Sequence, residues 1–465
     1  MTFYYFILKW LLIYNKKREG CVRYTSIAKG VKKLEKDVTI SEQKKHRIAI
    51  IGLGYVGLPL ARLFLEQGHT VYGIDVDHRK IQTLLAKQSY LSDFTNKEIR
   101  KMFAGDLFHV SDTFSAASQA DAIIICVPTP LDRDHKPDLT YVRGALKHAL
   151  PHLRRGQLVV LESSTYPGTT EEELQPMLES AGFTVGHDIF LAYSPERIDP
   201  GAQRTPLQDI PKVLGGVSER CRTFAEQVYS SVFSRVVPVS SPRVAEFTKL
   251  LENCQRLVNI SFMNELAIMS EKMNINLWEA IDAASTKPYG FTPYYPGPGI
   301  GGHCIPVDPL YLSWKAKQYG IDLQFIDIAH RINEQMPEYV VHRVRQQLSA
   351  KKPLEDSSVF VIGVTYKKDV NDLRESTAVP IVEGLLKLGI KVSYHDPYIP
   401  TLTLGERKLE SSDLTRRNLQ HHDAALILTD HSHIPYESVA SSARLVIDTR
   451  NATKNVADRR NIVLI

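Results

Sequence analysis

The chain has 465 residues, too many for one ordinary hydrophobic core, so two or three domains are expected. Its 43% hydrophobic and 23% charged residues are typical of a soluble globular protein. A net charge of +5 over this length suits anionic small molecules but is too weak for a nucleic-acid-binding stripe, so no nucleic-acid partner is expected.

The cysteines are odd in number and widely scattered, at Cys21, Cys126, Cys221, Cys254 and Cys304. This usage indicates a reducing compartment rather than a disulfide framework, and we expect a cytoplasmic catalytic body. No spacing of Cys and His residues suggests a metal site, so no metal is expected.

Residues 1–45 are interpreted as an N-terminal extension. The segment 3–14 is nearly all apolar, and its positive charges follow it, whereas in a signal peptide they come first. The segment is also too short to span a bilayer comfortably, so no integral membrane span is expected. An anchor on the membrane surface is the alternative.

The first folded elements predict a βαβ unit. A β-branched strand at 47–51 leads into a glycine turn at 52–57, a helix follows and ends at Gly68, and a second strand at 70–74 is followed by Asp75.

The glycine turn has the GxGxxG pattern of a dinucleotide site. Its glycines let the backbone approach a pyrophosphate at the helix N-terminus, and Asp75 would accept from both ribose hydroxyls, which favours NAD over NADP. Arg79 and Lys80 nearby could soften that preference. The alternative is that the glycines only shape a turn and bind no cofactor. The residues expected to bind the cofactor here are Gly52, Gly54, Tyr55, Val56, Gly57, Asp75 and Lys80.

Further along the chain, buried strands are predicted at 122–127 and 158–162, which implies a parallel, doubly wound sheet. Thr129, just after the first of these, is a candidate contact to the cofactor, with an ordinary loop as the alternative. The segment 243–287 contains neither Gly nor Pro and predicts one long helix, or two in tandem, between two lobes. This helix could supply a dimer face.

The α/β rhythm then returns, with a helix at 377–388 and strands at 359–364, 391–395, 424–429 and 444–448. The fold class is therefore α/β, with two doubly wound Rossmann-like domains joined by a long central helix. The domains are expected at 46–240, 241–345 and 346–465. The second lobe has a glycine after its first strand but lacks the later ones, so a second dinucleotide is not expected.

Lys367, Lys368 and Arg374 lie in the loop after that glycine and offer cations to a diphosphate. A solvated charged loop is the alternative interpretation.

Cys304 lies in a glycine- and proline-rich loop that excludes a regular element. Asp308 is predicted to cap a helix that starts at Pro309 and ends at Gly320. A thiol beside that helix N-terminus and His303 should have a depressed pKa, as a nucleophile needs. Beside an NAD site, such a thiolate can add to an aldehyde and carry the oxidation on to a thioester, which water hydrolyses to the acid.

This chemistry also needs an oxyanion stabiliser and a general base. Lys249 and Asn253 are spaced i, i+4 and project from one helix face, although an exposed helix face would have the same spacing. Glu196 follows a strand-like run and is either a catalytic carboxylate or an ordinary loop residue. Asp308 could position water.

With these residues in hand, the chain from about residue 46 to the end resembles the UDP-glucose/GDP-mannose dehydrogenase family. The motifs that carry the resemblance, in order, are GLGYVGLPLA, SSTYPGTT, YSPER, EFTKLLEN, GPGIGGHCIPVDP and YKKDVNDLRES. The resemblance implies an NAD domain, a dimer formed along the central helix, a UDP-binding domain, and a four-electron oxidation without release of the aldehyde. A homodimer or larger homo-oligomer is therefore expected.

The resemblance also implies residue roles. Cys304 is the nucleophile, Lys249 and Asn253 stabilise oxyanions, Asp308 and Thr165 place the hydrolytic water, and Glu196 acts as acid/base or positions water. The residues that it implies bind the sugar nucleotide are Glu196, Arg197, Lys249, Asn253, Gly301, Gly302, Arg331 and Lys367, and Thr165, Lys367 and Arg374 also serve the cofactor.

The cysteine loop resembles the branch that acts on N-acetylated UDP-hexosamines, which favours UDP-N-acetylglucosamine, with UDP-N-acetylmannosamine or UDP-glucose as alternatives. The acid product is expected to serve polysaccharide synthesis. Three rival functions are a two-electron hydroxyacid-type dehydrogenase, a non-catalytic nucleotide-sugar sensor, and a membrane-tethered scaffold for polysaccharide assembly.

Overall fold

The computed structural model describes residues 44–91, 94–132, 136–197, 205–302, 304–350 and 352–465. Residues 45–465 form one compact unit. The expected N-terminal extension, Cys21 and His303 lie outside the described residues. Within the described residues, no helix combines the length and the apolar character that crossing a membrane requires.

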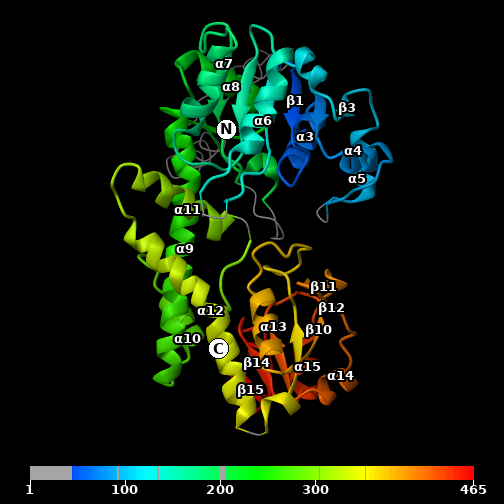
Figure 1. Ribbon diagram of the computed structural model, residues 1–465, viewed down its shortest axis with the longest axis vertical. Coiled ribbons are helices and arrows are strands. Elements are labelled where there is room, and N and C mark those ends of the chain that lie inside the picture. The colour runs from blue at the N-terminus through cyan, green and yellow to red at the C-terminus, as the bar shows by residue number, and fades with distance from the viewer. Residues whose placement is uncertain (1–43, 92–93, 133–135, 198–204, 303, 351) are drawn as a thin grey trace, which may run out of the picture. The chain divides into compact units, whose positions relative to one another are not determined.

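The N-terminal lobe is built on one eight-stranded sheet (Figure 1). Every pair of neighbouring strands is parallel except β6 and β7. In spatial order the strands are β3 (Phe108–Ser111), β2 (Thr70–Ile74), β1 (Arg47–Ile51), β4 (Ala122–Ile125), β5 (Leu158–Leu161), β6 (Phe190–Tyr193), β7 (Lys212–Gly216) and β8 (Val236–Val239).

Helices cover both faces of this sheet because its strands are apolar on both sides. In β1, Ile48 and Ile50 pack into one core, whereas Ala49 and Ile51 pack into the other. The first core is covered by α3 (Gly57–Glu66), α4 (His78–Leu85), α5 (Asn96–Met102) and α8 (Glu219–Tyr229). The second is covered by α6 (Thr140–Ala149), α7 (Gln175–Ser180), and parts of α9 (Pro242–Lys272) and α11 (Cys304–Lys317).

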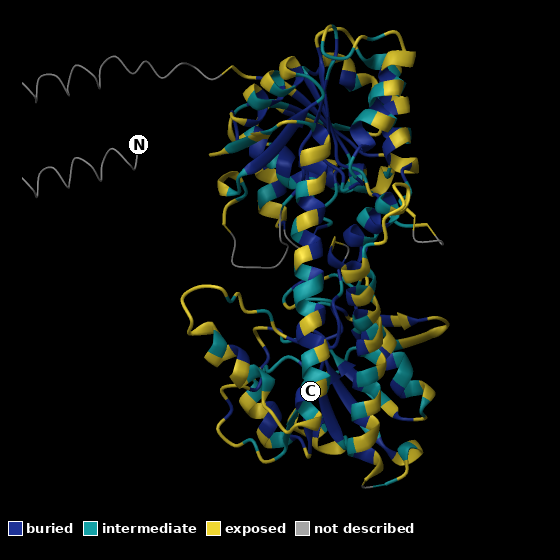
Figure 2. Cartoon of the chain, turned by 90° about the vertical axis from the view of Figure 1, so that its left-hand side faces the viewer, coloured by how far each residue is buried: buried dark blue, intermediate teal, exposed yellow. Residues whose placement is uncertain are grey.

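The segment 243–287, predicted to form one long helix or two in tandem, forms two helices in tandem. Ser241 caps α9, and Pro242 occupies its first turn, where a missing N–H costs nothing. Asn274, with a left-handed φ of 55°, separates α9 from α10 (Leu277–Ser285). Along α9, buried and exposed residues alternate as stripes (Figure 2).

The C-terminal lobe has a five-stranded, all-parallel sheet. Its strands in spatial order are β10 (Lys391–His395), β9 (Ser358–Ile362), β13 (Ala424–Ile427), β14 (Val446–Asp448) and β15 (Ile462–Leu464), and β11 (Thr401–Leu404) and β12 (Arg407–Glu410) form a separate hairpin. Its helices are α12 (Gln324–Ser349), α13 (Ala378–Lys387), α14 (Arg416–His421) and α15 (Tyr436–Ser442). The predicted α/β class with two doubly wound lobes and a central helix is confirmed.

Candidate functional site

The glycine turn between β1 and α3 is shaped for close backbone approach. Gly52 has a φ of 96°, and a Cβ there would meet the Cys126 carbonyl oxygen at 2.5 Å. A Cβ at Gly57 would collide with the Gly52 carbonyl, so the helix can start this close to the turn only with glycine. Gly54 faces open space, which leaves room for a ligand against the backbone.

Asp75 stands at the end of β2, beside this turn. Its Oδ2 accepts hydrogen bonds from the Leu53 N–H and the Lys80 ammonium, both at 2.9 Å, and its Oδ1 accepts from the Asp77 N–H. Arg79 is engaged by Asp77 instead. The turn, the carboxylate and the start of α3 together fit the pyrophosphate and a ribose of a dinucleotide.

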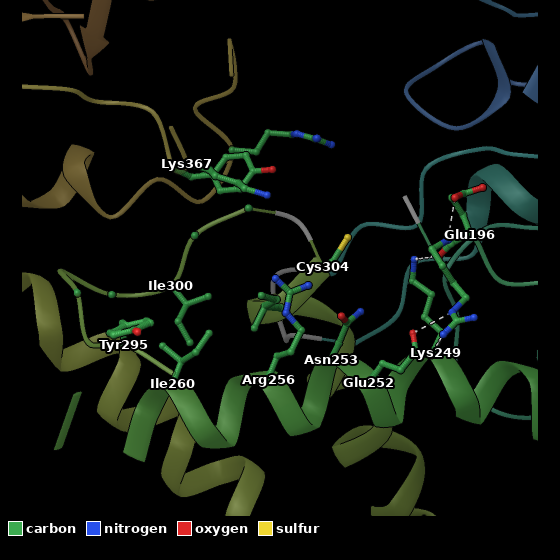
Figure 3. A pocket seen from close by; sticks show the side chains of 18 of the residues that line it. Glu196, Lys249, Glu252, Asn253, Arg256, Ile260, Tyr295, Ile300, Cys304 and Lys367 are labelled. Carbon is green, nitrogen blue, oxygen red and sulfur yellow. Dashed lines mark hydrogen bonds and ion pairs between the residues drawn. The ribbon is translucent and has the colours of Figure 1, made fainter. Parts of the chain in front are cut away.

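A second site is a pocket lined by residues from α9, the cysteine loop, the segment after β6 and the C-terminal lobe (Figure 3). It brings together nine of the predicted site residues, namely Glu196, Arg197, Lys249, Asn253, Gly301, Gly302, Cys304, Lys367 and Arg374. Other lining residues include Glu252, Arg256, Ile260, Tyr295, Tyr366 and Arg450.

The wall of the pocket on α9 carries Lys249 and Asn253 on the side of the helix that faces Cys304 (Figure 3). The Lys249 ammonium donates to the Glu196 carbonyl at 2.6 Å, and the Asn253 amide donates to Oδ2 of Asp308 at 2.6 Å. Both α9 side chains are buried, so their i, i+4 spacing is not that of an exposed helix face.

Cys304 is the first residue of α11 and remains solvent-exposed, whereas the other described cysteines are buried. Its thiol nevertheless lies close enough to packed protein that burial raises its pKa above the ordinary value of 9.0. The Lys249 ammonium acts in the opposite direction, and Asp308 adds to the rise. The prediction of a depressed Cys304 pKa is therefore wrong, because the effect of burial on this pKa exceeds the opposite effect of the Lys249 ammonium.

The predicted helix start at Asp308 and Pro309 is also wrong. Both residues lie inside α11, which begins four residues earlier. The first four N–H groups of a helix have no intrahelical partner, so Pro306 fits in this first turn. Pro309 lies beyond it, and the helix gives up one internal hydrogen bond there.

Asp308 is consequently a fully buried carboxylate rather than a helix cap. Burial raises its pKa from 3.8 to about 6, against the lowering effects of Lys249 and the Asn253 hydrogen bond. Among the described residues, its Oδ1 atom has no hydrogen-bond partner, which leaves an acceptor for a water molecule.

Apart from Asp308 and the residues of the glycine turn, three predicted residues lie outside the set that lines the pocket. Thr165 is buried and shares a 2.6 Å hydrogen bond with Thr169. Thr129 is buried after β4, and its carbonyl accepts from the Tyr311 hydroxyl. Arg331 is exposed on α12 and lines a separate surface hollow, so its place beside the sugar stays a prediction.

The glycines before Cys304 pack against the C-terminal lobe. A Cβ at Gly302, whose φ is 83°, would lie 2.6 Å from the Tyr366 ring. The Gly302 N–H donates to the Arg374 carbonyl at 3.1 Å. The Arg374 guanidinium lies 5.4 Å from the centre of the Tyr55 ring, so one arginine joins the pocket to the glycine turn.

Sequence reasoning missed Arg256 and Arg450 as pocket residues. Arg256 follows Lys249 and Asn253 at i+7 and i+3 on α9, a periodicity that could have identified it. Arg450 comes after β14, at the carboxyl edge of the second sheet, where ligands of such folds bind.

The two sites define a dinucleotide-dependent enzyme with a cysteine in its pocket, and comparisons with known proteins specify the class. The family profiles of the UDP-glucose/GDP-mannose dehydrogenase family match in order: the NAD-binding domain at 46–233, the central domain at 243–335 and the UDP-binding domain at 360–455.

The chain is 40% identical to Protein CapL of Staphylococcus aureus over 75% of its length and 81% of that protein. It is 34% identical to UDP-N-acetyl-D-glucosamine 6-dehydrogenase of Salmonella typhi, over 83% and 90% of the two chains. The solved structure of the UDP-D-ManNAc dehydrogenase of Pyrococcus horikoshii superposes with a TM-score of 0.81 at 33% identity, covering 90% of this chain and 98% of that one.

The chain therefore belongs to the UDP-glucose/GDP-mannose dehydrogenase family, and it is an oxidoreductase that uses NAD. The glycine turn and Asp75 are the parts of its fold that fit this cofactor.

Proposed function

We propose that the protein oxidises the C6 alcohol of a UDP-N-acetylhexosamine, UDP-N-acetylglucosamine first, to the carboxylate. The observation that carries this proposal is Cys304, exposed in a pocket that also holds Lys249 and Asn253. An alcohol-to-aldehyde oxidation needs no thiol, whereas a covalent route on to the acid does. UDP-N-acetylmannosamine is the second candidate, because the P. horikoshii relative is named for that sugar.

The chemistry conserves atoms and electrons. NAD, when bound, accepts one hydride in each of two oxidations. The Cys304 thiolate adds to the aldehyde carbon to give a thiohemiacetal, whose oxidation gives a thioester, and water displaces the thiolate. One alcohol and one water become one carboxylate, two hydrides and three protons.

Lys249 and Asn253 are the proposed oxyanion stabilisers, because each ends in an N–H donor on the pocket wall of α9. Asp308 is the proposed partner of the hydrolytic water, with Thr165 in support. The Asp308 pKa of about 6 makes this carboxylate a better proton acceptor than an ordinary aspartate at neutral pH. Glu196, at the edge of the same pocket, is the proposed acid/base or water-positioning group.

The C-terminal wall is the proposed diphosphate site. Lys367, Arg374 and Arg450 bring three cationic side chains to the pocket, and guanidinium groups suit phosphate oxygens. The UDP-binding profile over 360–455 includes all three, which supports a uridine diphosphate as the handle of the substrate.

We also propose a homodimer along α9. Val244, Phe247, Leu251, Phe262 and Met269 are large apolar side chains that are exposed on this helix. Their spacings of 3, 4, 11 and 7 residues place them in one stripe, on the side opposite Asn253. A stripe of this kind is typical of an interface. We place the enzyme in the cytoplasm, where its acid product would supply polysaccharide synthesis.

The test is the stoichiometry of NADH formation. Purified protein is given limiting UDP-N-acetylglucosamine and excess NAD, with UDP-N-acetylmannosamine and UDP-glucose in parallel. We expect two NADH per sugar, no acid product from Cys304→Ala, and normal turnover by Cys221→Ala, which removes a buried thiol from α8. One NADH per sugar, unaffected by loss of Cys304, would refute the covalent route and favour a two-electron dehydrogenase.

A further inference from the structure

A buried group of charged side chains lies beneath the segment that carries Glu196. Lys212, the first residue of β7, places its ammonium 2.8 Å from Oε2 of Glu162 and 3.6 Å from Oε2 of Glu196. The Tyr229 hydroxyl, on α8, donates to the other oxygen of Glu162. All four side chains are nine-tenths or more buried. Only Glu196 among them lines the pocket.

Lys212 also holds the backbone of this segment. Its ammonium donates to the Pro195 carbonyl at 3.3 Å, while the Lys249 ammonium donates to the neighbouring Glu196 carbonyl at 2.6 Å. Two lysines from different elements thus fix consecutive peptide groups. The Arg197 N–H then donates to Oε1 of Glu196 at 2.7 Å, which sets the direction of its carboxylate.

Stability alone does not account for such a group. Taking charges out of water is expensive, and apolar side chains of similar volume often replace a buried ion pair at no loss. Here two carboxylates share one ammonium, so the group carries a net negative charge when both are ionised. The arrangement is explained if its role is to act on the carboxylate of Glu196.

We propose that Lys212 is a positioning residue that fixes the orientation of Glu196 and places a positive charge beside its carboxylate, while Glu162 competes with Glu196 for the same ammonium. The inference deepens the proposed function, because it rests on Glu196 taking part in the chemistry. Lys212 itself stays out of the pocket and does not meet the substrate.

Among the residues that the structure describes, the other titratable groups near Glu196 differ from Lys212 in what they offer its carboxylate. Burial raises the pKa of the thiol of Cys126 and of the hydroxyls of Tyr193 and Tyr229, which keeps all three neutral. Arg197 is paired with Glu252 through two hydrogen bonds. Lys249 meets the segment through the backbone carbonyl.

The pKa values of Glu162 and Lys212 are both raised, but for different reasons. Burial raises the pKa of the Glu162 carboxyl, so this side chain takes up a proton more readily than an exposed glutamate. Burial acts to lower the pKa of Lys212, but Glu162 and Glu196 together raise it, so the ammonium stays charged.

The test compares the acid limb of the kcat–pH profile in three variants. Lys212→Met removes the cation and is expected to move the limb to higher pH by about one unit or more, as loss of an opposite charge at this distance does. Glu162→Gln removes the competitor and is expected to move the limb to lower pH. Lys212→Arg keeps the charge and should restore a limb close to that of the unaltered protein.

Opposite shifts support the proposal, because a purely structural role would lower stability in both variants without moving the limb in opposite directions. Unmoved limbs, or limbs that move the same way, would overturn it. Asp308 also contributes to the acid limb, so each variant is measured again in an Asp308→Asn background, where that contribution is absent. If Lys212→Met does not fold, the downward shift in Glu162→Gln still decides the question.

A second measurement needs no turnover and separates failure of this inference from failure of the proposed function. The unfolding temperatures of Lys212→Met, Glu196→Gln and the double variant form a cycle. We expect the double variant to lose less than the sum of the two single losses. Additive losses would overturn the inference even in an active enzyme, whereas coupled losses in a protein that oxidises no UDP-sugar would refute only the proposed function.

Discussion

Glu246 predicts an unusual dependence of stability on pH. It is fully buried on α9, three residues before Lys249. One of its oxygens accepts from the Gly168 N–H at 2.5 Å, and the other accepts from the N–H and hydroxyl of Thr170 at 2.9 and 2.7 Å. These bonds tie α9 to the loop that carries Thr165 and to the π-helical turn Thr170–Leu174 that follows it.

Burial raises the pKa of Glu246 from 4.5 to about 7, although the three hydrogen bonds oppose the rise. A raised carboxyl pKa means that the folded state binds a proton that the unfolded state has already released. The stabilisation is therefore complete below pH 4.5 and is lost as the pH rises through 7. The difference of roughly 2.5 units corresponds to about 3 kcal/mol of unfolding free energy.

The test is Glu246→Gln, which mimics the protonated form at every pH. At pH 5 the variant should be less stable by about 1–2 kcal/mol, because its amide NH₂ faces a donor in place of one hydrogen bond. At pH 8 the order should reverse, since only the unaltered protein has lost the protonation contribution. Urea unfolding followed by tryptophan fluorescence measures both, with Glu338→Gln on the exposed side of α12 as the control. Parallel stability curves between pH 5 and 8 would refute the reasoning.

Three further predictions concern the pocket. Lys249→Met should slow alkylation of Cys304 by iodoacetamide at pH 8, because the ammonium lowers the pKa of that thiol; an unchanged rate would show that the two do not interact. Gly302→Ala should lower the unfolding free energy by about 1–2 kcal/mol for its left-handed φ, and should also weaken substrate binding by pushing the Tyr366 ring away, measured as a higher KM. Asp308→Asn should lower kcat by about 100-fold or more and remove a rise in activity centred near pH 6; a rise that persists would assign it to another group.

Local sequence patterns predicted the strands well, because most strands are short, buried apolar runs bounded by residues that break regular structure. The strands at Arg47–Ile51, Thr70–Ile74 and Lys391–His395 have the bounds that the sequence predicted. The start of α11 was missed because the sequence signal, an acid followed by proline, has the same appearance whether the proline begins a helix or interrupts one.

Pocket residues were predictable where a motif or a helical period joined them, as on α9. The direction of the Cys304 pKa was not, because it depends on how much protein surrounds the sulfur in three dimensions. Lys212 and Glu246 were also out of reach. Each is an unremarkable charged residue in the sequence, and only the tertiary fold brings its partners together.

A comparison of the two Rossmann-like lobes shows why, among the described residues, only the first has a turn suited to a dinucleotide. Asp396 follows β10 as Asp75 follows β2, but its carboxylate already accepts from four backbone N–H groups and is bonded to the buried His431. Little acceptor capacity remains for ribose hydroxyls. After β9 the chain also takes fifteen residues, 363–377, before α13 begins, whereas α3 starts directly from its glycine turn. That longer loop carries Lys367 and Arg374 to the pocket. Where the first lobe offers a helix N-terminus to a dinucleotide, the second lobe therefore offers cationic side chains, which suit a diphosphate.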